Sequence, residues 1–266
     1  MSGGSSESAA EAGGDWPAEA VDLVQAVADT KLLLSQRYAE WMLAGPALED
    51  DIAGASAAQD EIGHVRQLFR LLARQGRDQD WLEGDREPEA FANVASLDEK
   101  PATWVELIVS ADAAERAAWY LLDAIAHEDF DGLATRIGQD EYFHLEHLDG
   151  RLETLAADDA EALTDALESS LPPALALLGP ASYDDEADPL VAAGFTDRSV
   201  ADMRAAFRRT YEELLDGTDL SLSGVDWDAP DEDAWNAERR RVDGGGIDHE
   251  TLSSLRGTAN AEFRIE

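Results

Sequence analysis

Two short motifs carry the residues best suited to chemistry. Glu61 lies three positions before His64, and Glu141 lies three positions before His144. Residues three apart on a helix share one face, so each motif would present a carboxylate and an imidazole together. Each motif also interrupts a stripe of apolar residues, and a buried carboxylate is costly unless it is paired or binds a metal. Two such motifs therefore indicate a cation shared between two helices.

A di-iron carboxylate site in a helical bundle needs one more carboxylate from each of two other helices. Glu40 follows an apolar helical pattern and is the candidate from the first of these. Asp112, on a stripe with Val105 and Ile108, is the candidate from the other, and Glu115 one turn away competes with it. Such a set of oxygen and nitrogen ligands suits iron or manganese. The pattern predicts two iron ions, with manganese as the alternative.

The composition also offers a simpler explanation of these motifs. Acidic residues are 58 of 266, about a fifth, so about one of the five histidines would follow an acid at this spacing by chance. On that interpretation Glu40, Glu61 and Glu141 are surface acids. The remaining histidines are expected to be ordinary surface or packing residues: His127, His147 and His249.

Apolar residues at helical spacing predict helices over residues 21–43, 49–73, 102–127 and 132–156. These form two similar hairpins, 21–75 and 102–156. Each hairpin has a candidate carboxylate on its first helix and a Glu-x-x-His motif on its second. That repeat predicts an all-α, ferritin-like four-helix bundle with additional C-terminal helices.

The rest of the chain is expected to extend this bundle. A fifth helix is predicted over 158–178, where Pro172 and Pro173 should kink or end it, and a sixth over 199–215. We expect a disordered acidic leader over 1–14, the bundle over 15–216, and an extension over 217–266 that packs on the bundle or on a partner.

The charge balance excludes several classes of function. Asp and Glu number 58 against 20 Lys and Arg, giving a net charge of -38 that would repel nucleic acid and anionic membranes. We interpret the acid excess as adaptation to a salt-rich cytoplasm, where the charges are screened. Cysteine is absent, which excludes disulfides and Cys-ligated metals. No apolar run is long enough to span a membrane, and residues 1–14 lack the features of a signal peptide.

Three stretches of the chain resemble a known family. They are 34–41 (LSQRYAEW), 47–53 (ALEDDIA) and 59–66 (QDEIGHVR). In this order they resemble the A-type and C-type chains of the bacterial phenylacetyl-CoA oxygenase (1,2-epoxidase). The overall likeness is closest to the C-type chain, whereas the Glu-x-x-His motifs are similar to those of the A-type chain. The A-type lysine one turn before the first motif is replaced here by Ala57.

The resemblance implies a monooxygenase of phenylacetate catabolism. It implies a multi-subunit complex in which an A-type catalytic chain epoxidises an aryl-CoA thioester with dioxygen and electrons from a separate reductase. The family's spacing favours Asp112 over Glu115, completing the expected ligand set Glu40, Glu61, His64, Asp112, Glu141 and His144. Two alternatives stay open: a non-catalytic structural member of that complex, or a ferritin-like protein that handles iron or peroxide.

Overall fold

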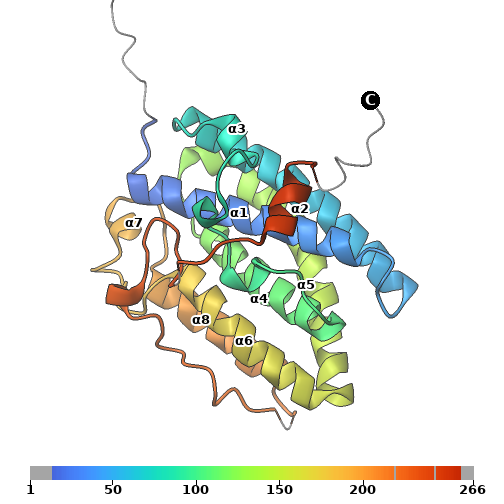
Figure 1. Ribbon diagram of the computed structural model, residues 1–266. Helices are drawn as coiled ribbons and strands as arrows, with labels where there is room; N and C mark the ends of the chain where they lie inside the picture. Colours follow the sequence, from blue (N-terminus) through green and yellow to red (C-terminus); the bar gives the residue numbers. More distant parts are fainter. Residues whose placement is uncertain (1–13, 219, 243, 259–266) are drawn as a thin grey trace, which may run out of the picture.

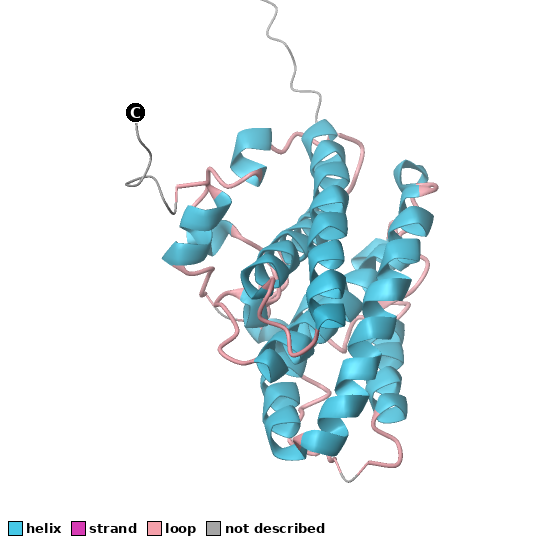
Figure 2. Ribbon diagram, turned by 90° about the vertical axis from the view of Figure 1, so that its right-hand side faces the viewer, coloured by secondary structure: helices cyan, strands magenta, loops and turns pink. Residues whose placement is uncertain are grey.

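The computed structural model describes residues 14–218, 220–242 and 244–258, and every regular element in them is helical (Figures 1 and 2). The expected leader falls almost wholly outside these residues. The longer helices are α1 (Ala18–Trp41), α2 (Leu48–Arg74), α4 (Trp104–Asp123), α5 (Leu133–Asp158), α6 (Ala160–Leu178), α8 (Val200–Leu214) and α9 (His249–Leu255). The short ones are α3 (Gln79–Leu82), α7 (Pro189–Ala192) and four 3₁₀ turns.

Helices α1 and α2 form one hairpin and α4 and α5 form the second, as predicted. The two hairpins meet through contacts of α1 with α4 and of α2 with α5 (Figure 1). Helix α6 packs against α4, and α8 contacts α4, α5 and α6. The predicted all-α bundle with added C-terminal helices is confirmed.

Side-chain hydrogen bonds to backbone N–H groups mark the starts of three of these helices. The Asp50 carboxylate accepts a hydrogen bond from the Ala47 N–H at the start of α2, and Thr103 Oγ1 accepts one from the Glu106 N–H at the start of α4. Asp159 Oδ1 accepts from the Ala162 N–H where α5 gives way to α6. Each such bond satisfies a backbone N–H that has no partner within or before the helix. These bonds stabilise the first turns of α2, α4 and α6.

Helix α1 lies in the middle of the fold and is buried on nearly all sides. Besides leucines and valines it buries Asp29, Lys31 and Arg37. Asp29 pairs with the buried guanidinium of Arg86, and Ala92 N donates to the same carboxylate. A charge removed from water is tolerated when it is paired and hydrogen-bonded in this way.

Of the two effects expected of Pro172 and Pro173, a kink or an end of the fifth helix, the end does not occur. Helix α6 runs through both prolines to Leu178. It ends at Gly179, which has a φ of 114° that suits glycine, and Arg204 and Arg240 donate to carbonyls of its last turn. A proline removes one backbone N–H, but packing on α4 holds the helix together.

The segment after α8 runs back along the bundle. Arg239 donates to the Phe91 carbonyl and Arg241 pairs with Asp98. Near the end of the described part, Thr251 of α9 accepts a hydrogen bond from Arg37 of α1. None of the described helices has the length and apolar character needed to cross a membrane.

Candidate functional site

A lysine lies between the two Glu-x-x-His motifs at the centre of the bundle. The Lys31 ammonium, on α1, donates to both carboxylate oxygens of Glu61, at 3.0 and 3.2 Å. It also donates to Oε1 of Glu141 at 2.5 Å. All three side chains are essentially fully buried. The shared cation that the two motifs indicate is therefore present as a side chain of the protein.

Two groups of buried side chains surround this lysine, and they share Glu61. One consists of Glu61, His64 and Glu141, and the other of Glu61, Glu115 and His144. Within each group the potential ligand atoms lie within 4.8 Å of one another, so each could hold a metal ion. Helix α2 supplies Glu61 and His64, α5 supplies Glu141 and His144, and α4 supplies Glu115.

Glu40, the carboxylate expected from the first helix, belongs to neither group. It lies nine residues after Lys31, which is about 180° around an α-helix, and both its oxygens accept from Arg37 at 2.9 Å. Helix α1 therefore turns Lys31 to the centre and Glu40 to the opposite side. The structure therefore does not bring Glu40 together with the other expected ligands.

Asp112 is buried but also lies outside both groups. Its carboxylate accepts from Arg116 at 2.8 Å and from the Tyr211 hydroxyl of α8. Glu115, the competing candidate, accepts instead from the Tyr38 hydroxyl at 2.8 Å and lies 3.7 Å from Nδ1 of His144. The structure brings Glu115, and not Asp112, to the centre.

The two histidines are oriented by acids that the sequence analysis did not single out. Nε2 of His64 lies 3.1 Å from Asp140, and Nε2 of His144 lies 3.4 Å from Asp60. Each acid directly precedes the glutamate of the opposite motif, so the two hairpins hold each other's imidazoles. An aspartate directly before the glutamate of each motif is the sequence feature that could have identified these two acids.

This arrangement leaves four ligand-type atoms buried without a hydrogen-bond partner: Nδ1 of His64, Nδ1 of His144, Oε2 of Glu115 and Oε2 of Glu141. Both Nδ1 atoms lie 3.6 to 3.7 Å from carboxylate oxygens of the centre. A histidine held through one nitrogen with the other free toward carboxylates is the usual geometry of a metal ligand. The donor types thus suit a cation.

Burial and crowding set the charges of the acids. Burial raises the pKa of Glu61, but Lys31 and His64 outweigh it and lower the value to about 2. Burial and the neighbouring Glu61 charge raise the pKa of Glu141 to about 7, against the opposing effect of Lys31. Burial, with Glu141 and Glu61 nearby, raises the pKa of Glu115 well above its usual range. Burial and the crowding of three carboxylates around one lysine thus disfavour the ionised forms of Glu141 and Glu115.

The number of carboxylates at the centre shows whether two iron ions fit there. A di-iron site of this architecture has four carboxylates to balance two divalent ions. Here three carboxylates face the centre, and α1 supplies an ammonium where the fourth carboxylate is required. Lys31 already holds oxygens of both glutamates that come from the two motifs. The residues present do not fit a pair of irons while Lys31 keeps this position.

An apolar cavity of about 360 Å³ opens beside the centre. Its wall includes Tyr38, Trp41 and Trp104, and it reaches His144 and Phe143 of α5. Four acids also line it: Asp50, Asp51, Asp60 and Asp140. An uncharged, aromatic or aliphatic group suits its walls, whereas an anionic group is repelled by these acids.

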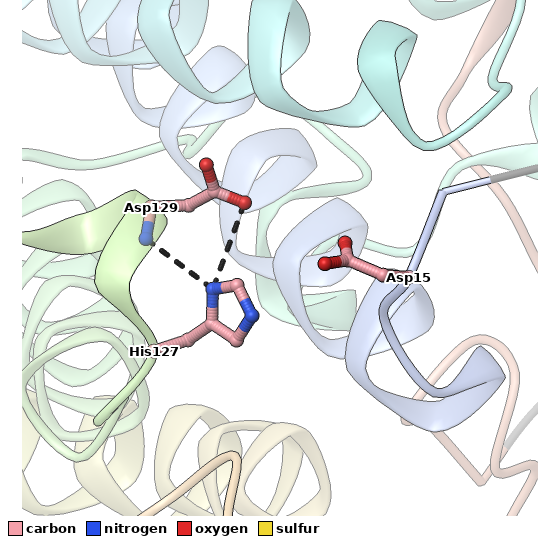
Figure 3. A group of neighbouring side chains, drawn as sticks. All are labelled: Asp15, His127 and Asp129. Carbon is pink, nitrogen blue, oxygen red and sulfur yellow. Dashed lines mark hydrogen bonds and ion pairs between the residues drawn. The ribbon is translucent and has the colours of Figure 1, made fainter.

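A second set of potential ligands lies at the surface, where Asp15, His127 and Asp129 approach one another (Figure 3). Asp129 already accepts from the Trp16 indole at 2.9 Å, and His127 Nδ1 accepts from the Asp129 backbone N–H at 3.3 Å. Asp15 is exposed. These bonds satisfy the group as a structural contact between the start of α1 and the turn before α5.

Comparison with known proteins agrees with the architecture. The profile of the family described as phenylacetic acid catabolic protein matches residues 7–251, most of the chain. No curated protein matches it. The matched range includes both hairpins and the buried residues at the centre of the bundle: Lys31, Glu61, His64, Glu115, Glu141 and His144. The chain therefore belongs to the phenylacetic acid catabolic protein family.

Proposed function

We propose that this chain is the non-catalytic member of a multicomponent oxygenase of phenylacetate catabolism. The complex acts on an aryl-CoA thioester, such as phenylacetyl-CoA, by ring epoxidation. Its metals reside in an A-type catalytic chain, and a separate reductase supplies electrons. The family match supports the pathway, and the centre of the bundle supports the role within the complex.

The observation that carries this proposal is the position of Lys31. Its ammonium bonds to Glu61 and Glu141, the two glutamates that the Glu-x-x-His motifs would supply to a di-iron centre. A positive charge at this point opposes a divalent ion by direct repulsion in a medium of low dielectric. The remaining ligand types then serve a buried ion-pair network that keeps the two hairpins in register.

The lining of the cavity supports the same assignment of roles to this chain and the A-type chain. Coenzyme A carries several phosphate charges, and four aspartates line the cavity beside the centre. An anionic substrate would be repelled there. Binding of the thioester is therefore assigned to the catalytic chain.

The test separates metal binding from turnover. The purified chain is treated anaerobically with ferrous iron in concentrated salt, freed of excess iron, and assayed for iron per chain. It is then assayed for aryl-CoA-dependent oxygen consumption with a reductase, first alone and then with the A-type chain. We expect less than one iron per chain, no turnover alone, and faster or more coupled turnover when both chains are present.

About two irons per chain, together with turnover in the absence of the A-type chain, would overturn the proposal and make this chain the catalyst. Peroxide consumption by the iron-treated chain alone would instead favour an iron-handling or peroxide-handling protein. A Glu61→Gln variant distinguishes iron held at the centre from iron held loosely by surface acids, since only the former is lost.

A further inference from the structure

The exposed large hydrophobic side chains of the described residues gather in two short segments. Four lie at and after the α1–α2 turn: Met42, Leu43, Leu48 and Ile52. Two lie on α5: Tyr142 and Phe143. We call these six residues the α2–α5 face. The one other exposed large hydrophobic residue of the described part is Val242.

The two segments flank one cavity. Met42 and Phe143 both line the apolar cavity described above, as do Asp50 and Asp51 of the first turn of α2. Tyr142 contacts Phe143 edge to face, with ring centroids 5.4 Å apart. The α1–α2 turn projects from the side of the bundle (Figure 1). The cavity and its flanking side chains together make an apolar surface with a hollow.

The backbone of the turn keeps one of these side chains in water. Leu43 is 83% exposed and has a φ of 69°, a left-handed conformation that a leucine rarely adopts. Such a conformation is strained for a residue with a side chain as large as leucine's. Glycine or asparagine would adopt it with less strain, and no contact within the described residues takes this side chain out of water.

Several occupants would cover a surface of this kind, and the described contacts favour a protein. A small molecule in the cavity would leave Leu43, Leu48 and Ile52 exposed. An anionic membrane would meet Glu49, Asp51 and Glu146, which lie among the apolar residues or one turn from them. A second copy of this chain would bring the same acids face to face.

We propose that the α2–α5 face is the docking surface for the A-type catalytic chain, which meets it with an apolar patch bordered by Lys or Arg. This inference rests on the proposed function and names the surface that function uses. Large apolar patches with a polar border mark protein interfaces. Complementary charge around the border selects the partner and its orientation.

The experiment measures binding of the purified A-type chain by calorimetry in concentrated salt. The test variant carries Leu43→Ser and Ile52→Ser, both at exposed positions. The matched control is Val242→Ser, which removes an exposed hydrophobic residue outside the face. We expect the double variant to lose affinity by about tenfold or more, as for central interface residues, and the control to bind as the wild type does. Circular dichroism and the unfolding midpoint confirm that all three chains are folded alike.

The outcomes separate this inference from the proposed function. If the wild type and the double variant bind the A-type chain equally well, the α2–α5 face is not the docking surface, whereas the proposed complex is supported. If the wild type does not bind the A-type chain, both proposals fail. If the wild type dimerises and the double variant is monomeric, the occupant is a second copy and the inference is overturned.

Discussion

The ammonium of Lys31 offers the sharpest test of how the bundle centre is held together. A Lys31→Met variant keeps a long unbranched side chain but leaves Glu61 and Glu141 without their shared cation. Breaking a buried pair from one side costs about 3–5 kcal/mol. At about 2–4 °C of melting temperature per kcal/mol for a chain of this size, the midpoint should fall on the order of 10 °C.

The assay is thermal unfolding in concentrated salt with a chelator, and again with manganese(II). Lys100→Met is the matched control, because Lys100 is the only other lysine and is exposed. In Lys31→Met the unpartnered carboxylates and imidazoles are free to bind the metal, so manganese should restore stability. At a hundredfold excess over its dissociation constant the gain is about 2.7 kcal/mol. The wild type should gain nothing comparable.

Two outcomes would refute this reasoning. The first is a Lys31→Met protein as stable in chelator as Lys100→Met, since the ion pairs would then contribute little. The second is a wild type that manganese stabilises as strongly as it does the variant. In that case the lysine would leave the centre on metal binding, and the two-metal interpretation would return.

Two further predictions concern a carboxyl group and a glycine of α5. Burial raises the pKa of Glu141 from 4.5 to about 7, so between these values the unfolded chain has released a proton that the folded chain keeps. This group alone should therefore lower the free energy of unfolding by ~3 kcal/mol as the pH rises from 4.5 to 7, and denaturant titrations should show a smaller fall for Glu141→Gln than for the wild type; equal pH profiles would contradict this. Gly138→Ala should destabilise the fold by about 1–3 kcal/mol, because its Cβ would lie 2.4 Å from the Trp119 ring. Gly150→Ala on the same helix meets no atom within 4 Å and should be neutral or stabilising by up to about 1 kcal/mol; a loss as large as that of Gly138→Ala would show that packing at Trp119 is not the cause.

The sequence was sufficient to predict the two hairpins and the inward position of both Glu-x-x-His motifs. Helices α2 and α5 each have one buried and one exposed face, so the apolar period shows which side points inward. Helix α1 is buried on almost every side, so the spacing of its apolar residues does not show which side faces the bundle centre. Glu40 was therefore assigned inward and Lys31 was not considered, although a lysine beside the apolar run 32–34 is unusual.

Helical periodicity left Asp112 and Glu115 both open, and the spacing of the resembled family favoured Asp112, whereas the structure places Glu115 beside Lys31 and His144. Both acids are fully buried on α4, three residues and thus about 60° apart. What separates them is the partner each meets: Tyr211 and Arg116 for Asp112, and Tyr38 for Glu115. Tyr211 and Tyr38 lie on other helices, and their proximity follows only from tertiary packing, which helical periodicity does not encode.

The hydrogen bonds of Arg37 have a consequence for the order of events during synthesis. This buried guanidinium, on the first long helix, donates to the Leu97 and Asp98 carbonyls and to Thr251, 214 positions further along the chain. While the nascent chain is shorter than this, the contact with Thr251 and the cover that α9 gives to the guanidinium cannot form. The last cover over this part of α1 therefore forms late, and a ribosome-bound chain halted before Thr251 should exchange amide hydrogens near Arg37 faster than the finished chain does.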